Sequence, residues 1–194
     1  MNPQQPIVAV LLAAGAGTRF GGGKLLHPLP DGVAIAAHAV RNLKAADLEV
    51  IAVVRAGDFP LADMLEQEGA HVFPCAEAVR GMGHSLAHGI GASKDVAGWV
   101  VALADMPRVQ PFTIRSIADA IRDGATIAAP VYRGERGHPV GFAPTLRGEL
   151  LALSGDSGAR AVLERHRDAV RLIECDDPGI VVDIDARADL DRIA

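Results

Sequence analysis

The residues best suited to chemistry lie near the N-terminus, in a glycine-rich stretch that reads LLAAGAGTRFGGGK over residues 11–24. Its glycines permit positive φ angles and a close approach of the backbone to a ligand, and successive amide N–H groups can then point at phosphate oxygens. Arg19 and Lys24 add positive charge. Because residues 7–12 form an apolar run long enough for a buried strand, the sequence predicts a strand that opens into an anion-binding loop rather than a solvated surface loop.

Two familiar phosphate loops do not fit this stretch. The Walker A pattern requires a glycine five residues before the Gly-Lys pair and a Ser or Thr after the lysine, but those positions hold Thr18 and Leu25. The dinucleotide fingerprint G-x-G-x-x-G would begin at Gly15 and Gly17, but Phe20 stands where its third glycine belongs. The loop is therefore of another kind.

A carboxylate, Asp105, comes shortly after the apolar run 98–103. In a mostly parallel sheet, ligands bind beyond the carboxyl ends of the strands, so residues at those ends are the first candidates for a site. A carboxylate there can hold Mg²⁺, which binds a few carboxylates together with water and phosphate oxygens. The alternative is an aspartate that caps the turn before the helix expected to begin at Pro111.

The C-terminal segment offers two further carboxylates, Asp183 and Asp185. We expect a strand over residues 180–184, and on extended chain these two side chains point the same way while Ile184 points to the opposite side. Either carboxylate can complete a metal site with the one after the run 98–103. The alternative is that both only cap the last helix.

Three more segments carry candidate binding residues. The stretches 80–86 and 154–160 each precede a helical pattern, and helix N-termini attract anions through their unpaired N–H groups, although both stretches can equally be simple caps. His138 lies in a glycine-broken turn, residues 132–142. It can donate a hydrogen bond to a phosphate or orient an acceptor, but a lone histidine before a strand is also often a satisfied turn residue.

Apolar runs typical of strands alternate with helical patterns along the 194 residues, which indicates parallel β-α-β construction. The expected strands are 7–12, 48–54, 71–74, 98–103, 126–129, 139–142, 169–173 and 180–184. The expected helices are 33–44, 61–68, 85–92, 111–122, 146–153 and 159–167. A hydrophobic content of 49% is ample for one core, so the sequence predicts a single α/β domain over residues 1–194.

Composition excludes several classes of protein. The net charge is −5 and no block of Lys or Arg occurs, so a nucleic-acid partner has no electrostatic footprint. The spacing of Cys75 and Cys175 indicates neither a zinc site nor a disulfide framework. No apolar run approaches the length of a membrane span, and the N-terminus lacks the basic segment of a secretory signal. We therefore expect a cytoplasmic protein without a membrane partner.

The glycine-rich stretch also resembles the signature of a known family. The pattern L-A-A-G-x-x-x-R-[MF]-G-x-x-K directly after the first strand is similar to that of the MobA-like nucleotidyltransferases. The Leu-Ala-Ala-Gly form is most similar to the molybdenum cofactor cytidylyltransferase branch, whereas the guanylyltransferase branch usually has Leu-Ala-Gly-Gly, so Ala14 carries the distinction. The resemblance implies a three-layer α/β/α, Rossmann-like nucleotidyltransferase fold with a mostly parallel central sheet.

Later motifs extend the resemblance over nearly the whole chain. Leu-Ala-Asp-Met-Pro at 103–107 is similar to the family motif whose aspartate ligates the metal, and Gly-His-Pro-Val at 137–140 resembles an acceptor-side motif. The ending at 183–190 looks like the family's D-I-D-T-P-E-D-L. Here Ala186-Arg187 replaces Thr-Pro, so the start of the last helix is less well specified.

The resemblance implies roles for these residues. Arg19, Lys24 and Asp105 are the expected catalytic residues, and Mg²⁺ is expected on Asp105 and Asp183, with Asp185 as the other possible ligand. The expected nucleotide-binding residues are Leu12, Ala13, Ala14, Gly15, Gly17, Arg19, Lys24, Gly83 and Ser85. The expected acceptor-binding residues are His138, Asp156 and Arg160.

The implied reaction transfers CMP from CTP to a phosphorylated small molecule, molybdopterin or the molybdenum cofactor, and releases pyrophosphate. An acceptor phosphate is already ionised near neutral pH, so no general base is required and catalysis rests on positioning and charge. A molybdoenzyme or its maturation chaperone is the implied protein partner.

Three alternatives remain open. GTP-dependent guanylyl transfer to the same cofactor and nucleotidyl transfer to another phosphorylated metabolite would use the same site. The third is a nucleotide-binding accessory protein for molybdoenzyme maturation that lacks catalysis. The presence of both cations and of the metal-binding carboxylates argues against that third alternative.

Overall fold

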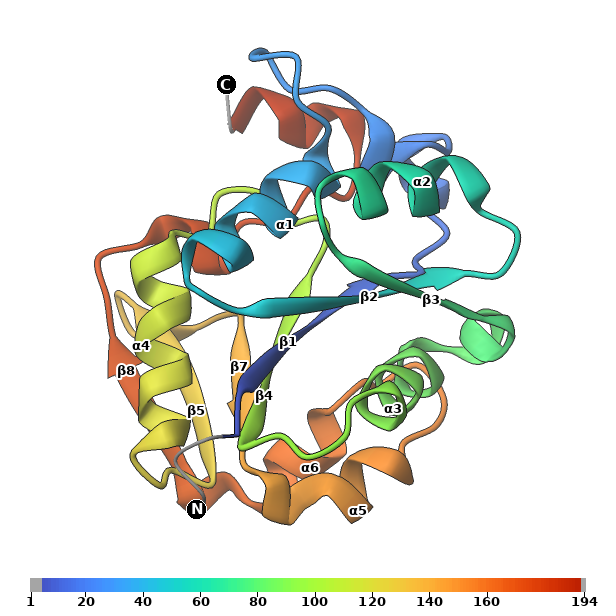
Figure 1. Cartoon of the computed structure of the whole chain (residues 1–194). Helices are drawn as coiled ribbons and strands as arrows, with labels where there is room; N and C mark the ends of the chain where they lie inside the picture. Colours follow the sequence, from blue (N-terminus) through green and yellow to red (C-terminus); the bar gives the residue numbers. More distant parts are fainter. Residues whose placement is uncertain (1–4, 193–194) are drawn as a thin grey trace.

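The computed structural model describes residues 5–192, and its centre is an eight-stranded sheet (Figure 1). The strands are β1 (Ile7–Ala13), β2 (Glu49–Arg55), β3 (His71–Cys75), β4 (Gly98–Leu103), β5 (Ile127–Tyr132), β6 (Glu135–Arg136), β7 (Val140–Phe142) and β8 (Val170–Glu174). They lie in the order β3-β2-β1-β4-β7-β5-β6, and β8 also pairs with β5. Strands β1 to β4 run parallel, β7 is antiparallel to both neighbours, and β8 is parallel to β5. The sheet is mostly parallel, as predicted.

Helices cover both faces of this sheet and complete the three predicted layers (Figure 1). The helices are α1 (Ile35–Ala45), α2 (Phe59–Gln67), α3 (Met82–Ala92), α4 (Pro111–Arg122), α5 (Arg147–Leu151) and α6 (Arg160–Arg165). Short 3₁₀ turns span Thr18–Phe20, Lys24–Leu26, Ala76–Arg80, Pro144–Leu146, Arg167–Ala169, Pro178–Val181 and Arg187–Arg192. Within residues 5–192, none of the helices has the length and apolar character needed to cross a membrane.

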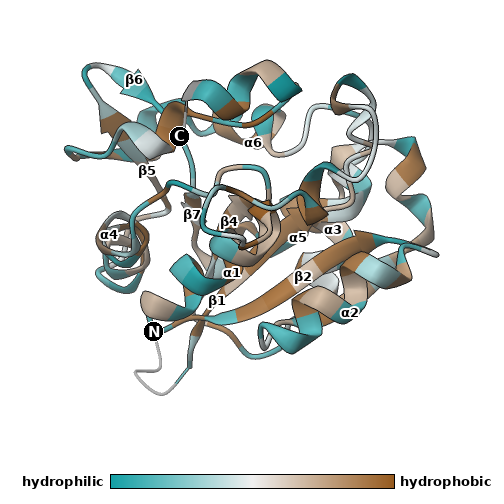
Figure 2. Cartoon of the chain, turned by 90° about the horizontal axis from the view of Figure 1, so that it is seen from above, coloured by the Kyte–Doolittle hydropathy of each residue, from teal (hydrophilic) through white to brown (hydrophobic). Residues whose placement is uncertain are grey.

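Alternate residues of β1 face two separate hydrophobic cores. Leu11 packs with the apolar faces of α1, α2 and α4, whereas Val10 packs with those of α3, α5 and α6. Side chains of successive strand residues point to opposite faces, so a strand covered on both sides must be apolar throughout. Figure 2 shows this as continuous hydrophobic colouring along β1 and β2.

The order of the strands fixes where a ligand can bind. β1 lies between β2 and β4, and Leu12 of β1 is paired with Leu103 of β4. The chain moves outward from β1 in one direction to reach β2 and in the other to reach β4, so the loops after β1 and β4 diverge and leave a crevice at this switch point. The glycine-rich stretch and Asp105 therefore come together at the same end of the sheet.

Seven of the eight expected strands are present, but the expected strand 180–184 is wrong. This segment begins as the 3₁₀ turn Pro178–Val181 and continues as irregular chain. Its two isoleucines are fully buried, which explains the apolar pattern without any strand pairing. The segment bonds to loops instead, since the amide of His138 donates to Ile180 O at 2.9 Å and the amide of Ile184 donates to Asp105 O at 3.0 Å.

A buried carboxylate anchors this C-terminal segment to the rest of the fold. Asp177 is only 1% exposed and accepts hydrogen bonds from Thr113 Oγ1 at 2.7 Å and from the amide of Gln110 at 2.9 Å, at the start of α4. It also accepts from the amide of Gly179 at 3.0 Å. The helix N-terminus further favours a negative charge at this position.

We predict that Asp177→Ala lowers the free energy of unfolding by about 3 kcal/mol, because two buried donors and one partly buried donor lose their acceptor. Urea unfolding monitored by circular dichroism measures this change. Thr113→Val removes one of the three bonds and serves as the matched control, with an expected loss of about 1 kcal/mol. Equal losses in both variants would contradict the anchoring role.

Candidate active site

The glycine-rich stretch folds after β1 as a compact loop containing the 3₁₀ turns Thr18–Phe20 and Lys24–Leu26. Positive φ angles occur at Gly17 (57°) and at the three glycines 21–23 (94°, 90° and 63°). These conformations are readily available only to glycine. A Cβ atom on Gly17 would lie 3.2 Å from the Cβ atom of Lys24. The loop therefore folds back on itself and brings Lys24 close to Gly17.

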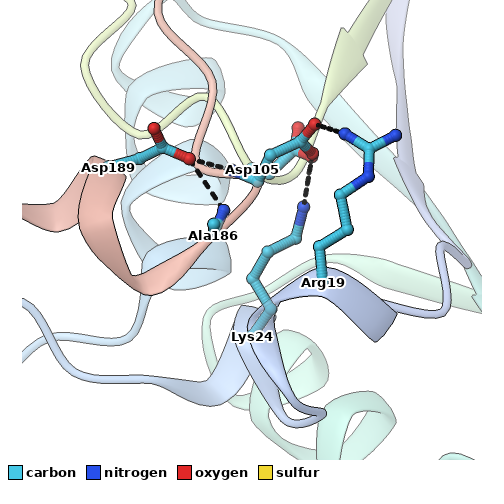
Figure 3. A network of polar contacts seen from close by, with 6 residues as sticks. Arg19, Lys24, Asp105, Ala186 and Asp189 are labelled. Carbon is cyan, nitrogen blue, oxygen red and sulfur yellow. Dashed lines mark hydrogen bonds and ion pairs between the residues drawn. The ribbon is translucent and has the colours of Figure 1, made fainter.

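Both cations of the loop contact carboxylates from other elements (Figure 3). Lys24 Nζ lies 2.7 Å from Asp105 Oδ2 and 3.6 Å from Asp185 Oδ1. Arg19 Nη1 lies 2.5 Å from Asp185 Oδ2. The Lys24 side chain is 10% exposed and that of Arg19 is 78% exposed, so the lysine lies inside the site and the arginine at its rim.

A cavity of about 520 Å³ opens beside these groups, and we call it the loop cavity. Its lining comes from the glycine-rich loop, from the ends of β1, β2 and β4, from the start of α3 and the segment before it, and from the loop between α5 and α6. The lining residues are Leu12, Ala14, Gly15, Ala16, Arg19, Lys24, Leu25, Arg55, Ala78, Val79, Gly81, Met82, Ser85, Leu103, Asp105 and Asp156. Its size suits a small-molecule ligand, and its cations suit an anionic one.

A second cavity of about 570 Å³ adjoins the first, and we call it the apolar cavity. The two cavities share Leu12, Met82 and Leu103 in their linings. The other apolar lining residues are Leu86, Val101, Val140, Phe142, Ala159 and Leu163, and the polar ones are Arg136, His138, Ser157, Arg160, Glu164 and Arg167. A ligand here would meet an apolar floor and several guanidinium groups.

His138 lies between the apolar cavity and the carboxylates. Its Nδ1 atom is buried and has no hydrogen-bond partner among the described residues. Burial lowers the pKa of this imidazole, the Coulombic effect of Arg136 lowers it further, and the negative charges of Asp105 and Asp183 oppose the shift. The ring is therefore biased toward its neutral form, which can both donate and accept a hydrogen bond.

The structure brings most of the expected nucleotide-binding residues to one place. Those lining the loop cavity are Leu12, Ala14, Gly15, Arg19, Lys24 and Ser85. Ala13 instead packs in the core beneath α1. Gly17 backs onto Lys24, and Gly83 packs against the backbone of Ser154, where a Cβ atom would come within 2.7 Å of the carbonyl oxygen.

The expected acceptor residues divide between the two cavities. His138 and Arg160 line the apolar cavity, whereas Asp156 lines the loop cavity. Asp185 contacts both cations, while Asp183 is exposed and close enough for its charge to act on His138. The amide of Asp185 donates to Asp189 Oδ2 at 2.9 Å, while its carboxylate faces the two cations.

Sequence reasoning missed several lining residues. Arg55 is the last residue of β2, and its Nη2 atom lies 3.4 Å from the carbonyl oxygen of Ala14. The rule that ligands gather at strand ends could have found it. Arg136 and Arg167 carried no such signal, because only the packing of β6 and of the turn after α6 brings them to the apolar cavity.

The carboxylates provide a donor set that suits a hard divalent cation. Asp105 lies at the wall of the loop cavity, and Asp185 contacts the same Lys24 ammonium. Among the described residues no group of three or more His, Cys, Asp or Glu side chains could hold a metal ion. A Mg²⁺ site built from two carboxylates, water and phosphate oxygens needs no third protein ligand.

A mostly parallel α/β sheet with an anion-binding loop and carboxylates at its switch point is typical of Rossmann-like proteins that bind nucleotides. Residues 9–170 match the sequence model of a protein family described as "MobA-like NTP transferase domain". This chain therefore belongs to the MobA-like NTP transferase family.

Three relatives match almost the entire chain. Nicotine blue oxidoreductase of Paenarthrobacter nicotinovorans is 30% identical over 96% of this chain and 96% of its own length. The nucleotidyl transferase Mth528 of Methanothermobacter is 29% identical with a TM-score of 0.82, covering 97% of this chain and 95% of its own. The manganese complex of Rv0371c from Mycobacterium tuberculosis H37Rv is 27% identical with a TM-score of 0.80, covering 97% of both chains.

The environment of His138 predicts a pH dependence of stability. Because its folded-state pKa is lowered, the proton binds more readily to the unfolded chain, and stability is lost as the pH falls through the ordinary histidine pKa of about 6.5. We expect the free energy of unfolding to fall more between pH 7 and pH 5 in the wild type than in His138→Asn. Equal slopes, measured by urea unfolding at each pH, would show that the imidazole is not destabilised in its charged form.

Proposed function

We propose that this protein transfers CMP from CTP to the phosphate of a molybdopterin-type acceptor, with Mg²⁺, and releases pyrophosphate. The observation that carries the proposal is the convergence of Arg19 and Lys24 with Asp105 in the loop cavity, which adjoins the apolar cavity and shares three lining residues with it. One cavity can hold a triphosphate and the other an acceptor, with the reacting phosphates meeting between them.

The loop cavity contains what a triphosphate requires. Lys24, Arg19 and the amides of the glycine-rich loop would bind the β- and γ-phosphates and stabilise the charge that develops on the leaving pyrophosphate. Asp105, together with Asp183 or Asp185, would hold Mg²⁺, whose chemistry is to neutralise and polarise the α-phosphate. The manganese complex of a relative supports a divalent cation in this family.

The apolar cavity would orient the acceptor. Its apolar floor suits a ring system, and Arg136, Arg160 and Arg167 at its wall suit an anionic group. The neutral His138 can hydrogen-bond to the acceptor. The attacking acceptor phosphate is already ionised, so these residues need to position it for in-line attack rather than remove a proton.

The nucleobase and the acceptor are the finer parts of the proposal. The choice of CTP rests on Ala14, which lines the loop cavity, and on the resemblance of its Leu-Ala-Ala-Gly motif to the cytidylyltransferase branch. The choice of molybdopterin rests on the acceptor-side motif around His138. One full-length relative is named an oxidoreductase, so a redox reaction is the competing outcome that an assay must include.

We expect pyrophosphate release from CTP with Mg²⁺ and molybdopterin, and much slower release from GTP, UTP or ATP. The assay compares the four nucleotides with and without the acceptor, and a parallel arm follows the absorbance of NADH and NADPH with oxidised aromatic substrates. A preference for GTP would remove the cytidylyl assignment and leave the transferase reaction. Reductase activity without any pyrophosphate release would contradict the proposed function.

Lys24→Ala and Asp105→Ala should each lower turnover by at least about 100-fold, the usual cost of removing a group that stabilises transition-state charge. Circular dichroism should show both variants folded, since their side chains are partly exposed in a cavity rather than in the core. Lys94→Ala, at an exposed lysine before β4, is the matched control and should keep wild-type turnover. Near wild-type rates in either site variant would refute these assignments.

A further inference from the structure

The cations proposed to bind phosphate are paired with carboxylates. Arg19 bonds to Asp185, and Lys24 bonds to Asp105 and lies 3.6 Å from Asp185. A guanidinium or an ammonium that faces a carboxylate is already partly neutralised, so an incoming phosphate must compete for it. Asp185 bonds to Arg19 and also lies near Lys24, so it competes with phosphate at both cations, whereas Asp105 competes at Lys24.

The backbone of the C-terminal segment holds Asp185 in place independently of these cations. The amides of Asp185 and Ala186 donate to Asp189 Oδ2 at 2.9 Å and 2.7 Å, as Figure 3 shows for Ala186 and Asp189. The preceding Ile184 is fully buried, and its amide donates to Asp105 O at 3.0 Å. The carboxylate is thus presented to the site by a fixed piece of chain.

The same segment contacts the glycine-rich loop at a second point. The Arg187 guanidinium lies 5.0 Å from the centroid of the Phe20 ring, and Phe20 is itself only 2% exposed. Arg187 stands where the family motif has proline, and its stacking ties the two segments together. Asp185 and the loop cations therefore stay close to one another whether or not they are paired.

We propose that Asp185 occupies the loop cations in place of phosphate, and that a divalent cation relieves this competition. When the metal binds with the nucleotide, Asp185 would exchange Arg19 for the metal and Asp105 would exchange Lys24 for it, so that both cations would become free to bind phosphate oxygens. This inference rests on the proposed function of the site. It makes anion binding weak without metal and strong with it, because one carboxylate opposes binding in the first state and assists it in the second.

Asp185→Asn should therefore change the affinity for pyrophosphate in opposite directions without metal and with Mg²⁺. Without metal, the substitution removes the carboxylate that competes with phosphate for Arg19. Because this ion pair is exposed and therefore weak, inorganic pyrophosphate should bind only about threefold more tightly. With Mg²⁺, the substitution removes a carboxylate that faces the metal, and pyrophosphate should bind at least about tenfold more weakly. Even the loss of a residue that only supports a metal ligand typically weakens metal binding by about this factor.

Isothermal titration calorimetry with inorganic pyrophosphate, with Mg²⁺ and with EDTA, tests this on the full chain. Asp191→Asn is the matched control, because it removes the same charge from an exposed residue of the same segment and should leave both affinities unchanged. Metal-free affinity that falls or stays constant in Asp185→Asn would overturn the inference. If the wild type and all variants fail to bind pyrophosphate even with Mg²⁺, the proposed function itself is wrong.

Discussion

The site depends on the parallel pairing of β1 with β4, which sets Leu12 opposite Leu103 at the switch point of the sheet. Because both strands end at the same edge, the loop after β1 and the carboxylate after β4 meet without any long connection. Lys24 then reaches Asp105 across 81 residues of sequence. The C-terminal segment is held at these strand ends too, since the amide of Ile184 donates to Asp105 O and Asp185 contacts Arg19.

Charge is concentrated where the two hydrophobic cores end. Both faces of β1 and β4 are packed with apolar side chains, and the loop cavity lies at the carboxyl edge of these strands. The C-terminal segment closes this edge by burying Ile180 and Ile184 in one core and leaving Asp185 facing the loop. A segment without regular strand structure thus completes the charged part of the site.

Much of this arrangement follows from the sequence. Seven strands and the meeting of Lys24 with Asp105 could be predicted, because buried parallel strands are continuous apolar runs and their ends share an edge. The strand expected at 180–184 could not be judged in this way, since two buried isoleucines give the same pattern whether they pack from a strand or from irregular chain. Asp185 contacts both cations, and Arg136 lines the apolar cavity. Both positions depend on how segments distant in the sequence pack, and a local sequence pattern does not predict such packing.

The most direct test of the central claim is the position of a divalent cation and a triphosphate in crystals grown with Mn²⁺ and a non-hydrolysable CTP analogue. The account predicts an anomalous manganese peak at ligand distance from Asp105 and a C-terminal carboxylate, with Arg19 and Lys24 on phosphate oxygens. A triphosphate bound away from the glycine-rich loop, or manganese that does not contact Asp105, would contradict the account.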